Sequence, residues 1–339
     1  MTVNFNEEVA IVTGAGGGLG RSHALSLAQR GARVVVNDIA PKGNGAGEDS
    51  PAELVAKEII ASGGSAIAHS CDVTDAPAVQ TMVDRVIGEW GRIDVLINNA
   101  GILRDRTFAK MDVDEFRSVL DVHLMGSVHC TKAVWPHMMS QQYGRILMTT
   151  SASGIYGNFG QSNYGAAKSG VVGLMNVLAI EGERYGIRVN ALAPTAATGM
   201  TEGLFDQASW DVMSPESITP GAVFLVSEGA PTKTILGAGG GVFAVAKMVE
   251  AAGVFLSHDE RSPEAIAEQW EAISDISATV ITGSAFDQTG RYLEMTTSTE
   301  AETSQPETTQ AATRETAASE PSATQTTPSD QTVTAKVQS

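Results

Sequence analysis

A glycine-rich loop near the start of the chain constrains the fold more than any other feature. Residues 9–13 (VAIVT) form a short apolar run typical of a buried strand, and the loop TGAGGGLG (13–20) follows directly. A helical pattern comes next, and a second apolar run over 33–37 ends on Asp38. Strand, glycine loop, helix, strand and acid in this order predict a unit that binds a dinucleotide at the amino end of its helix.

The residue types in this unit indicate which dinucleotide it binds. Glycines let the backbone approach a pyrophosphate, and the helix N-terminus favours its negative charge. The loop residues expected at the cofactor are Gly14, Gly18, Leu19 and Gly20. Asp38 would accept hydrogen bonds from the ribose hydroxyls and repel a 2′-phosphate, and no Arg or Lys lies within 14–20. We therefore expect NAD rather than NADP; a flexible glycine loop in an unrelated α/β protein is the alternative.

Strand and helix patterns alternate through the first 240 residues. Amphipathic segments typical of crossover helices separate the apolar runs. The runs lie at 9–13, 33–37, 66–69, 93–97, 145–149, 187–192 and 234–237. We therefore expect an α/β fold with one doubly wound parallel, Rossmann-like sheet of about seven strands. The ligand crevice should lie at the carboxyl ends of these strands.

A serine, a tyrosine and a lysine in the middle of the chain are spaced for proton transfer. Tyr164 and Lys168 are four residues apart and would share a helix face, and Ser151 precedes the tyrosine. A phenol with a pKa of ~10 is a poor base at neutral pH, but a neighbouring ammonium would lower that pKa. Ser151 would hold a substrate oxygen beside Tyr164, which predicts alcohol–ketone chemistry. A core or interface tyrosine and a solvated surface lysine are the alternatives.

Together these motifs resemble the short-chain dehydrogenase/reductase family, from Asn6 to about Gly241. The resemblance is carried by TGAGGGLG (13–20), Cys71-Asp72-Val73, Asn98-Asn99-Ala100-Gly101, Ser151, Tyr164-x-x-x-Lys168 and Pro194. Segments 101–111, 122–127, 143–168 and 178–187 are similar to one branch of that family. This branch comprises the (3R)-hydroxyacyl-CoA dehydrogenases of peroxisomal multifunctional enzyme type 2 and their stand-alone bacterial relatives. The similarity to it extends to about residue 277.

The resemblance implies roles for individual residues. Tyr164 would be the general base in oxidation, with Lys168 also holding the nicotinamide ribose. Cofactor contacts are implied for Asp72 and Val73 at the adenine, for Asn99, Ala100 and Gly101 at the riboses, and for Pro194 near the nicotinamide. Thr195 stands where the family usually has glycine, which departs from the pattern of that loop.

His123 is a second departure from the family pattern. Most members carry an asparagine at this helix position, where it supports a proton-relay water. An imidazole can also bridge a water or a backbone carbonyl, and it titrates near neutral pH. His123 is therefore either a catalytic relay or a packing residue.

The resemblance also implies a reaction. We expect NAD-dependent oxidation of a secondary alcohol on an acyl-CoA, either a (3R)-3-hydroxyacyl-CoA or a steroid side-chain hydroxyacyl-CoA. A 17β-hydroxysteroid dehydrogenase acting on free steroid and a catalytically idle NAD-binding scaffold are the alternatives. Arg104, Arg106 and Lys110 follow the NNAG motif and could meet the phosphates of coenzyme A. The alternative is a solvated basic loop paired with Asp105 and Asp112.

A substrate loop is expected over 195–220. Its apolar residues could wall an acyl or steroid pocket or belong to the core. They are Met200, Leu204, Phe205, Trp210 and Met213, with Thr198 and Thr201 as candidate hydroxyls.

Composition excludes several classes of partner. The net charge of −17 argues against nucleic acid and anionic membranes. Cys71 and Cys130 are isolated and the six histidines do not cluster, so no metal site is expected and a reduced, cytoplasmic setting is favoured. No apolar run is long enough to span a membrane, and the acidic start MTVNFNEEVA does not resemble a signal peptide. The expected partner is a small-molecule substrate.

The C-terminal part differs from the sheet domain expected over 6–241. A helical extension is expected over 242–290, because Val245, Met248, Val249 and Ala252 have helical spacing. From 296 to 339 Thr, Ser, Glu, Gln, Ala and Pro dominate, which predicts a disordered tail. By family analogy we expect a homodimer or homotetramer that pairs through the helices near 115–138 and 163–182.

Overall fold

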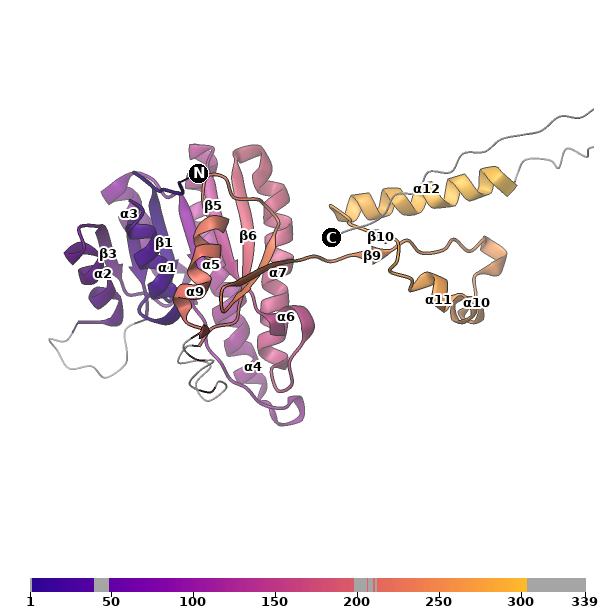
Figure 1. Cartoon of the computed structure of the whole chain (residues 1–339), viewed down its shortest axis with the longest axis horizontal. Helices are drawn as coiled ribbons and strands as arrows, with labels where there is room; N and C mark the ends of the chain where they lie inside the picture. The colour runs from indigo at the N-terminus through magenta and orange to yellow at the C-terminus, as the bar shows by residue number, and fades with distance from the viewer. Residues whose placement is uncertain (1, 40–48, 198–205, 207–209, 211, 304–339) are drawn as a thin grey trace, which may run out of the picture. The chain divides into compact units, whose positions relative to one another are not determined.

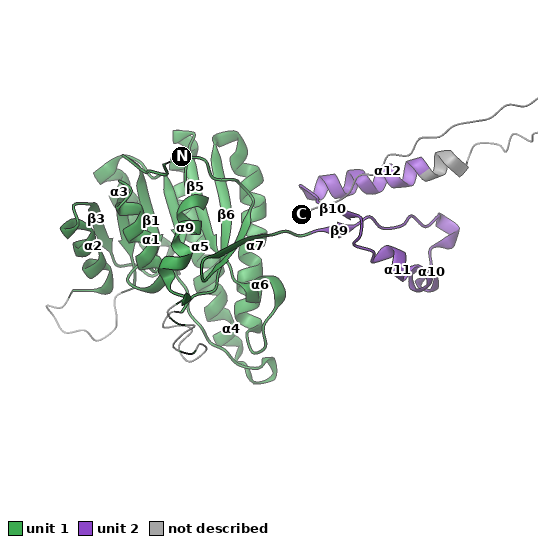
Figure 2. Ribbon diagram, in the orientation of Figure 1, with its two compact units in different colours: residues 1–248 green, residues 249–339 purple. Residues whose placement is uncertain are grey.

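The computed structural model describes residues 2–39, 49–197, 206, 210 and 212–303. The chain divides into two compact units, Met1–Met248 and Val249–Ser339 (Figure 2). The expected disordered tail falls mainly on 304–339, which lie outside the described residues. Its first residues, 296–303, belong instead to the end of a helix.

The first unit is built on one sheet, which has eight strands in the described residues (Figure 1). In spatial order the strands are β3 (Ser65–His69), β2 (Arg33–Asn37), β1 (Val9–Thr13), β4 (Val95–Asn98), β5 (Gly144–Thr149), β6 (Ile187–Pro194), β7 (Ile235–Gly239) and β8 (Val242–Ala246). All neighbouring pairs are parallel except β7 and β8. The order reverses between β1 and β4, and a doubly wound sheet binds its ligand at such a reversal. The predicted fold class is confirmed.

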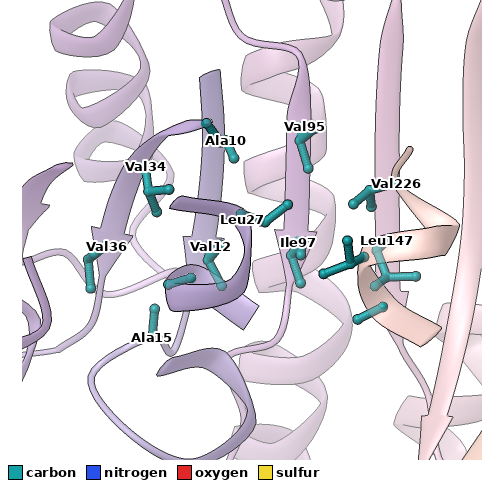
Figure 3. Close-up of a cluster of buried hydrophobic side chains, with 14 of the residues drawn as sticks. Ala10, Val12, Ala15, Leu27, Val34, Val36, Val95, Ile97, Leu147 and Val226 are labelled. Atoms are coloured by element: carbon teal, nitrogen blue, oxygen red, sulfur yellow. The ribbon is translucent and has the colours of Figure 1, made fainter. Parts of the chain in front are cut away.

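Helices cover both faces of this sheet. Helices α1 (Gly18–Ala28), α2 (Pro51–Ala61) and α9 (Pro215–Leu225) pack on one face, and α3 (Ala76–Trp90), α5 (Gly126–Gln141) and α7 (Ser162–Gly182) pack on the other. Alternate side chains of one strand therefore enter different cores: Ala10 and Val12 lie in the first cluster, Val9 and Ile11 in the second. Figure 3 shows the first cluster, with Leu27, Val34, Ile97 and Leu147 among its labelled side chains.

Short elements at the carboxyl edge of the sheet complete the unit. Helix α4 (Val113–Leu120) continues through a π-helical segment, Asp121–Met125, into α5. Helix α6 (Ala152–Tyr156) follows β5 directly. Helices α4 and α6 both contact α7, so they lie at the same end of the unit (Figure 1).

The prediction of a helical extension over 242–290 is wrong for residues 242–246, which form strand β8. Gly240 and Gly241 have φ angles of +55° and +81°, and they reverse the chain so that β8 pairs antiparallel with β7. Val245 has the helical spacing that suggested a helix, but it lies 54% exposed on this edge strand. The hairpin overrides the helical spacing because the two-residue turn places residues 242–246 beside the unpaired edge of β7.

The second unit contains helices and two short strands in its described residues. β9 (Glu250–Ala251) pairs antiparallel with β10 (Thr279–Val280). Its helices are α10 (Pro263–Glu268), α11 (Trp270–Ile273) and α12 (Ala285–Thr303). Glu250 holds α12 to β9: its carboxylate pairs with Arg291 at 2.7 Å and accepts hydrogen bonds from Gln288 and Tyr292.

Within the described chain, no helix combines the length and apolar character needed to cross a membrane.

Candidate functional site

A cavity of about 500 Å³ opens where the strand order reverses. Nine of the residues predicted at the cofactor line it: Gly14, Gly18, Leu19, Asp38, Asp72, Val73, Asn99, Ala100 and Gly101. Sequence reasoning missed six more: Gly17, Asn37, Ile39, Cys71, Ile102 and Val122. Asn37 ends β2 at the carboxyl edge, so the position of the strand could have indicated it. The size suits a small-molecule or cofactor site.

The glycine loop is held against the end of β4. The Thr13 hydroxyl accepts hydrogen bonds from the amides of Asn99 and Ala100, at 3.0 and 3.1 Å. In return the Asn99 side-chain amide donates to the carbonyls of Thr13 and Gly14, both at 3.0 Å. Both hydrogens of that amide are therefore used to fix the loop, so Asn99 shapes the cavity rather than donating from its side chain to a ribose.

Gly20 allows the same close contact between the glycine loop and Asn99, because it has no side chain. A Cβ at Gly20 would lie 2.1 Å from the carbonyl oxygen of Gly14 and 2.6 Å from the Asn99 side chain. Gly20 does not line the cavity, unlike the other predicted loop residues. No side chain caps the N-terminus of α1 at Gly17, which leaves its first amides to meet an anion. These features fit the pyrophosphate of a dinucleotide.

Asp38 lies on the cavity wall and also touches the loop. Its Oδ2 accepts a hydrogen bond from the Gly16 amide at 2.7 Å. Asp72, on the adjacent strand end, accepts from the amide and hydroxyl of Thr74 at 2.9 and 2.8 Å. The cavity thus carries two carboxylates at the end predicted for the adenosine, which would disfavour a further phosphate there.

The predicted catalytic residues lie together beside the cavity. Ser151 follows β5 and caps α6, and Tyr164 and Lys168 lie in α7. The Ser151 and Tyr164 side chains are hydrogen-bonded. The Lys168 ammonium nitrogen lies 5.5 Å from the centre of the Tyr164 ring and donates to the carbonyl of Thr149. Strand β5 and helix α7 therefore present the trio that the spacing predicted.

Burial changes the acid–base behaviour of this trio. It raises the pKa of Tyr164, with the hydrogen bond from Ser151 opposing and the charge of Asp105 adding to the rise. Complete burial lowers the pKa of Lys168 to about 7. The charge of Lys168 is not among the causes that shift the pKa of Tyr164, so the predicted lowering does not appear in this arrangement, where desolvation dominates at both groups.

His123 lies in the π-helical segment, between the cavity and Tyr164. Its ring meets the Tyr164 ring edge-on, with centroids 5.1 Å apart. Nε2 lies 2.7 Å from the Ile102 carbonyl oxygen, while Nδ1 is buried without a hydrogen-bond partner. A Cβ at Gly101 would lie 2.3 Å from His123 Cε1, so the glycine makes room for the imidazole.

The pKa of His123 is lowered to about 3, first by burial and then by the charge of Lys168. The expectation that it titrates near neutral pH is therefore wrong. A neutral imidazole packed on Tyr164 and bonded to Ile102 favours the packing interpretation.

Other predicted positions lie less centrally or outside the described residues. Pro194 ends β6 opposite Ala238 and does not line the cavity. Of the expected substrate-loop side chains, Trp210 and Met213 are half-buried. The others, Thr198, Met200, Thr201, Leu204 and Phe205, lie outside the described residues. Among described residues, no three His, Cys, Asp or Glu side chains are grouped to hold a metal ion.

Comparison with known proteins agrees with this geometry. Residues 8–209 match the model of the short chain dehydrogenase family. The chain is 42% identical to a putative short-chain type dehydrogenase/reductase of Mycobacterium tuberculosis, over 82% of this chain and 97% of the relative. The structure of full-length peroxisomal multifunctional enzyme type 2 from Drosophila melanogaster superposes with a TM-score of 0.74 at 37% identity. That match covers 87% of this chain and 50% of the other.

A third relative is a 7α-hydroxysteroid dehydrogenase solved with NADH and 7-oxo glycochenodeoxycholic acid. Its TM-score is 0.63 at 30% identity, covering 70% of this chain and 95% of the other. The chain spans only 31%, 42% and 49% of the curated peroxisomal enzymes it matches from yeast, mouse and fly. With the family model matching more than half of its residues, this chain belongs to the short-chain dehydrogenase family of oxidoreductases.

Proposed function

We propose that the protein catalyses the NAD-dependent oxidation of the secondary alcohol of a (3R)-3-hydroxyacyl-CoA, with a fatty or steroid side-chain acyl group. The observation that carries the proposal is the cluster of Ser151, Tyr164 and Lys168 beside the dinucleotide cavity. The similarity to multifunctional enzyme type 2 supports a hydroxyacyl-CoA as the substrate that carries the alcohol.

The trio supplies the proton chemistry. Ser151 donates a hydrogen bond to the substrate oxygen and holds it beside Tyr164. In oxidation the deprotonated Tyr164 takes the hydroxyl proton as the C=O bond forms, and Lys168, when protonated, stabilises negative charge on oxygen. Because burial raises the pKa of Tyr164, deprotonating this base is the step that higher pH favours. A bound nicotinamide would accept the hydride that leaves the carbinol carbon. The products are a ketone, a reduced cofactor and one proton.

The cavity wall supports NAD over NADP. Asp38 is fixed at the wall by its hydrogen bond to the Gly16 amide. A 2′-phosphate on the adenosine ribose would approach this carboxylate, and like charges at close range in a half-buried site cost binding energy.

A hydroxysteroid alcohol is the second candidate. The 7α-hydroxysteroid dehydrogenase relative, solved with a bile acid, supports this alternative. An idle NAD-binding scaffold is disfavoured, because a scaffold needs no buried Ser–Tyr–Lys cluster.

The test measures initial rates of NADH formation with (3R)- and (3S)-3-hydroxyacyl-CoA of several chain lengths, a steroid side-chain hydroxyacyl-CoA and free 17β-estradiol. NADP⁺ is the cofactor control. We expect turnover of a CoA thioester with NAD⁺, and a loss of at least about 100-fold in kcat for Tyr164→Phe, because the base is removed. Tyr292→Phe, which removes a tyrosine hydroxyl from helix α12 of the second unit, is the control and should retain kcat.

Turnover of free steroid alone would favour the second candidate. Equal kcat values for the wild type and Tyr164→Phe would refute the role of the tyrosine.

A further inference from the structure

Two loops beside the catalytic helix are fastened to each other. The first, 102–112, follows β4; the second, 157–161, joins α6 to α7. The Arg106 amide donates to the Gly160 carbonyl at 2.9 Å, and the Gln161 side chain donates to Asp105 at 2.7 Å. We call five exposed side chains of this pair and the adjoining α6 the paired-loop surface: Arg104, Phe108, Lys110, Tyr156 and Phe159. The same loops also expose Asp105, Arg106, Ala109, Asp112 and Asn158.

The paired-loop surface is fixed directly to the catalytic site. Asn163, fully buried, donates its side-chain amide to the Arg104 carbonyl at 2.9 Å and accepts from the Tyr164 amide at 2.7 Å. One end of the first loop, at Ile102, also lines the dinucleotide cavity. The backbone that carries Arg104 is therefore held by the residue directly before Tyr164.

Two cations of the surface carry no ion pair. Arg104 and Lys110 are exposed, and neither pairs with a carboxylate in the part of the chain that the structure describes. Asp105 is instead held by Gln161, and Asp112 caps α4 through the Asp114 amide. Arg106, the third cation of this loop, pairs with Glu115 at 3.1 Å. The loop is therefore partly ion-paired, but through Glu115 rather than through Asp105 or Asp112. Two unpaired cations are notable in a chain with a net charge of −17.

The same surface exposes three aromatic side chains. Phe108 and Tyr156 are each 76% exposed, and Phe159 is 88% exposed. Aromatic faces stack on nucleobases, and exposed Arg and Lys bind phosphates. An anionic molecule with a base and several phosphates matches both features, whereas a purely apolar chain would leave the cations unused.

We propose that the paired-loop surface binds the nucleotide end of coenzyme A in the thioester substrate. Arg104 and Lys110 hold its phosphates, and Phe108 and Phe159 contact the adenine. This inference rests on the proposed function and assigns the part of the site that recognises the carrier rather than the acyl group.

The test compares two substrates with the same acyl group. One is the CoA thioester, and the other is the N-acetylcysteamine thioester, which ends before the phosphates. For Arg104→Ala/Lys110→Ala we expect KM for the CoA thioester to rise about tenfold or more, because charge-assisted contacts are lost, with kcat unchanged. Both constants for the N-acetylcysteamine thioester should stay unchanged. Lys57→Ala/Arg85→Ala removes the same charge far from the loops and should match the wild type.

Other outcomes of these measurements would refute either the coenzyme A inference or the proposed function, and the two cases can be distinguished. An unchanged KM for the CoA thioester, or an equal rise for both thioesters, would refute the role of the two cations. A wild type that uses both thioesters with equal kcat/KM would do the same. A wild type that oxidises neither thioester but does oxidise free steroid would instead refute the proposed function. Phe159→Ala should raise KM for the CoA thioester selectively, which checks the aromatic contact independently.

Discussion

At the scale of single residues, burial decides the chemistry. Lys168 and His123 are both nearly inaccessible, and burial lowers the pKa of each, to about 7 and about 3. A second buried histidine, His23, lies away from Tyr164. Its Nδ1 lies 2.9 Å from the Thr219 hydroxyl, its Nε2 has no partner, and burial lowers its pKa to about 4.

His23 should make stability fall in acid. In the unfolded chain His23 is protonated below its pKa of 6.5, whereas in the folded protein it stays neutral down to about pH 4. The stability of the folded state is therefore lost as pH falls from 6.5 towards 4. Such a shift corresponds to about 3 kcal/mol at the acid end. His23→Asn keeps a donor to Thr219 and does not titrate. Urea unfolding at pH 6.5 and 4.5 should show a smaller loss for His23→Asn than for the wild type.

The wild type and His23→Asn must be compared at each pH, because Glu8 changes the stability with pH in the opposite direction to His23. Burial and the charge of Asp94 raise its pKa to about 7, so its contribution falls as pH rises from 4.5 to 7. Since Glu8 is present in both proteins, it cancels from the difference. The same pH dependence in both would contradict the role of His23.

At the scale of elements, close contacts between backbones fix the cofactor site. Strand β1, the glycine loop and helix α1 meet the end of β4 through Thr13, Asn99 and Gly20. The spacing of glycines in TGAGGGLG predicted the loop. The reason for Gly20 differs from that of its neighbours, because it makes room for Gly14 rather than for the cofactor.

Gly20→Ala should therefore destabilise the protein even without cofactor. A helical alanine is favoured over glycine by about 1 kcal/mol, but the new Cβ would collide with the Gly14 carbonyl, and overpacking costs about 1–3 kcal/mol or more. We expect a net loss measurable by urea unfolding. Gly88→Ala, inside helix α3, is the control, since a Cβ there meets nothing within 4 Å. Equal stability of the two variants would show that the loop gives way at little cost.

At the scale of the whole molecule, helix α7 has an outer face that its own unit leaves uncovered. Val171 and Met175 are buried against the sheet, whereas Val177 and Ile180 are 53% and 51% exposed. Ile180 borders a groove of about 650 Å³ shared with Trp135, Met139 and Tyr185. The groove also has Glu181, Glu183 and Arg184 in its lining. Pairing of α5 and α7 with a second copy stays a prediction, for which these exposed apolar side chains are the candidate contact.

Val177→Glu/Ile180→Glu should weaken that pairing. Light scattering at micromolar concentration should find a dimer or tetramer for the wild type and a smaller species for the variant, because two buried charges would oppose association. Leu54→Glu, at a comparably exposed position on α2, is the control and should not change the mass. A monomeric wild type would contradict the expectation of pairing.

The sequence by itself determined strands β1 to β7, the glycine loop and the Ser151–Tyr164–Lys168 spacing. These depend on local periodicity and on residues a few positions apart, which fold close together whatever surrounds them. Tertiary structure decided the rest. β8 formed a hairpin because β7 had a free edge, Asn99 was used to hold the glycine loop, and His123 and Lys168 changed their pKa values. These effects are caused by burial and by contacts with residues far away in the sequence, and the local sequence pattern predicts neither.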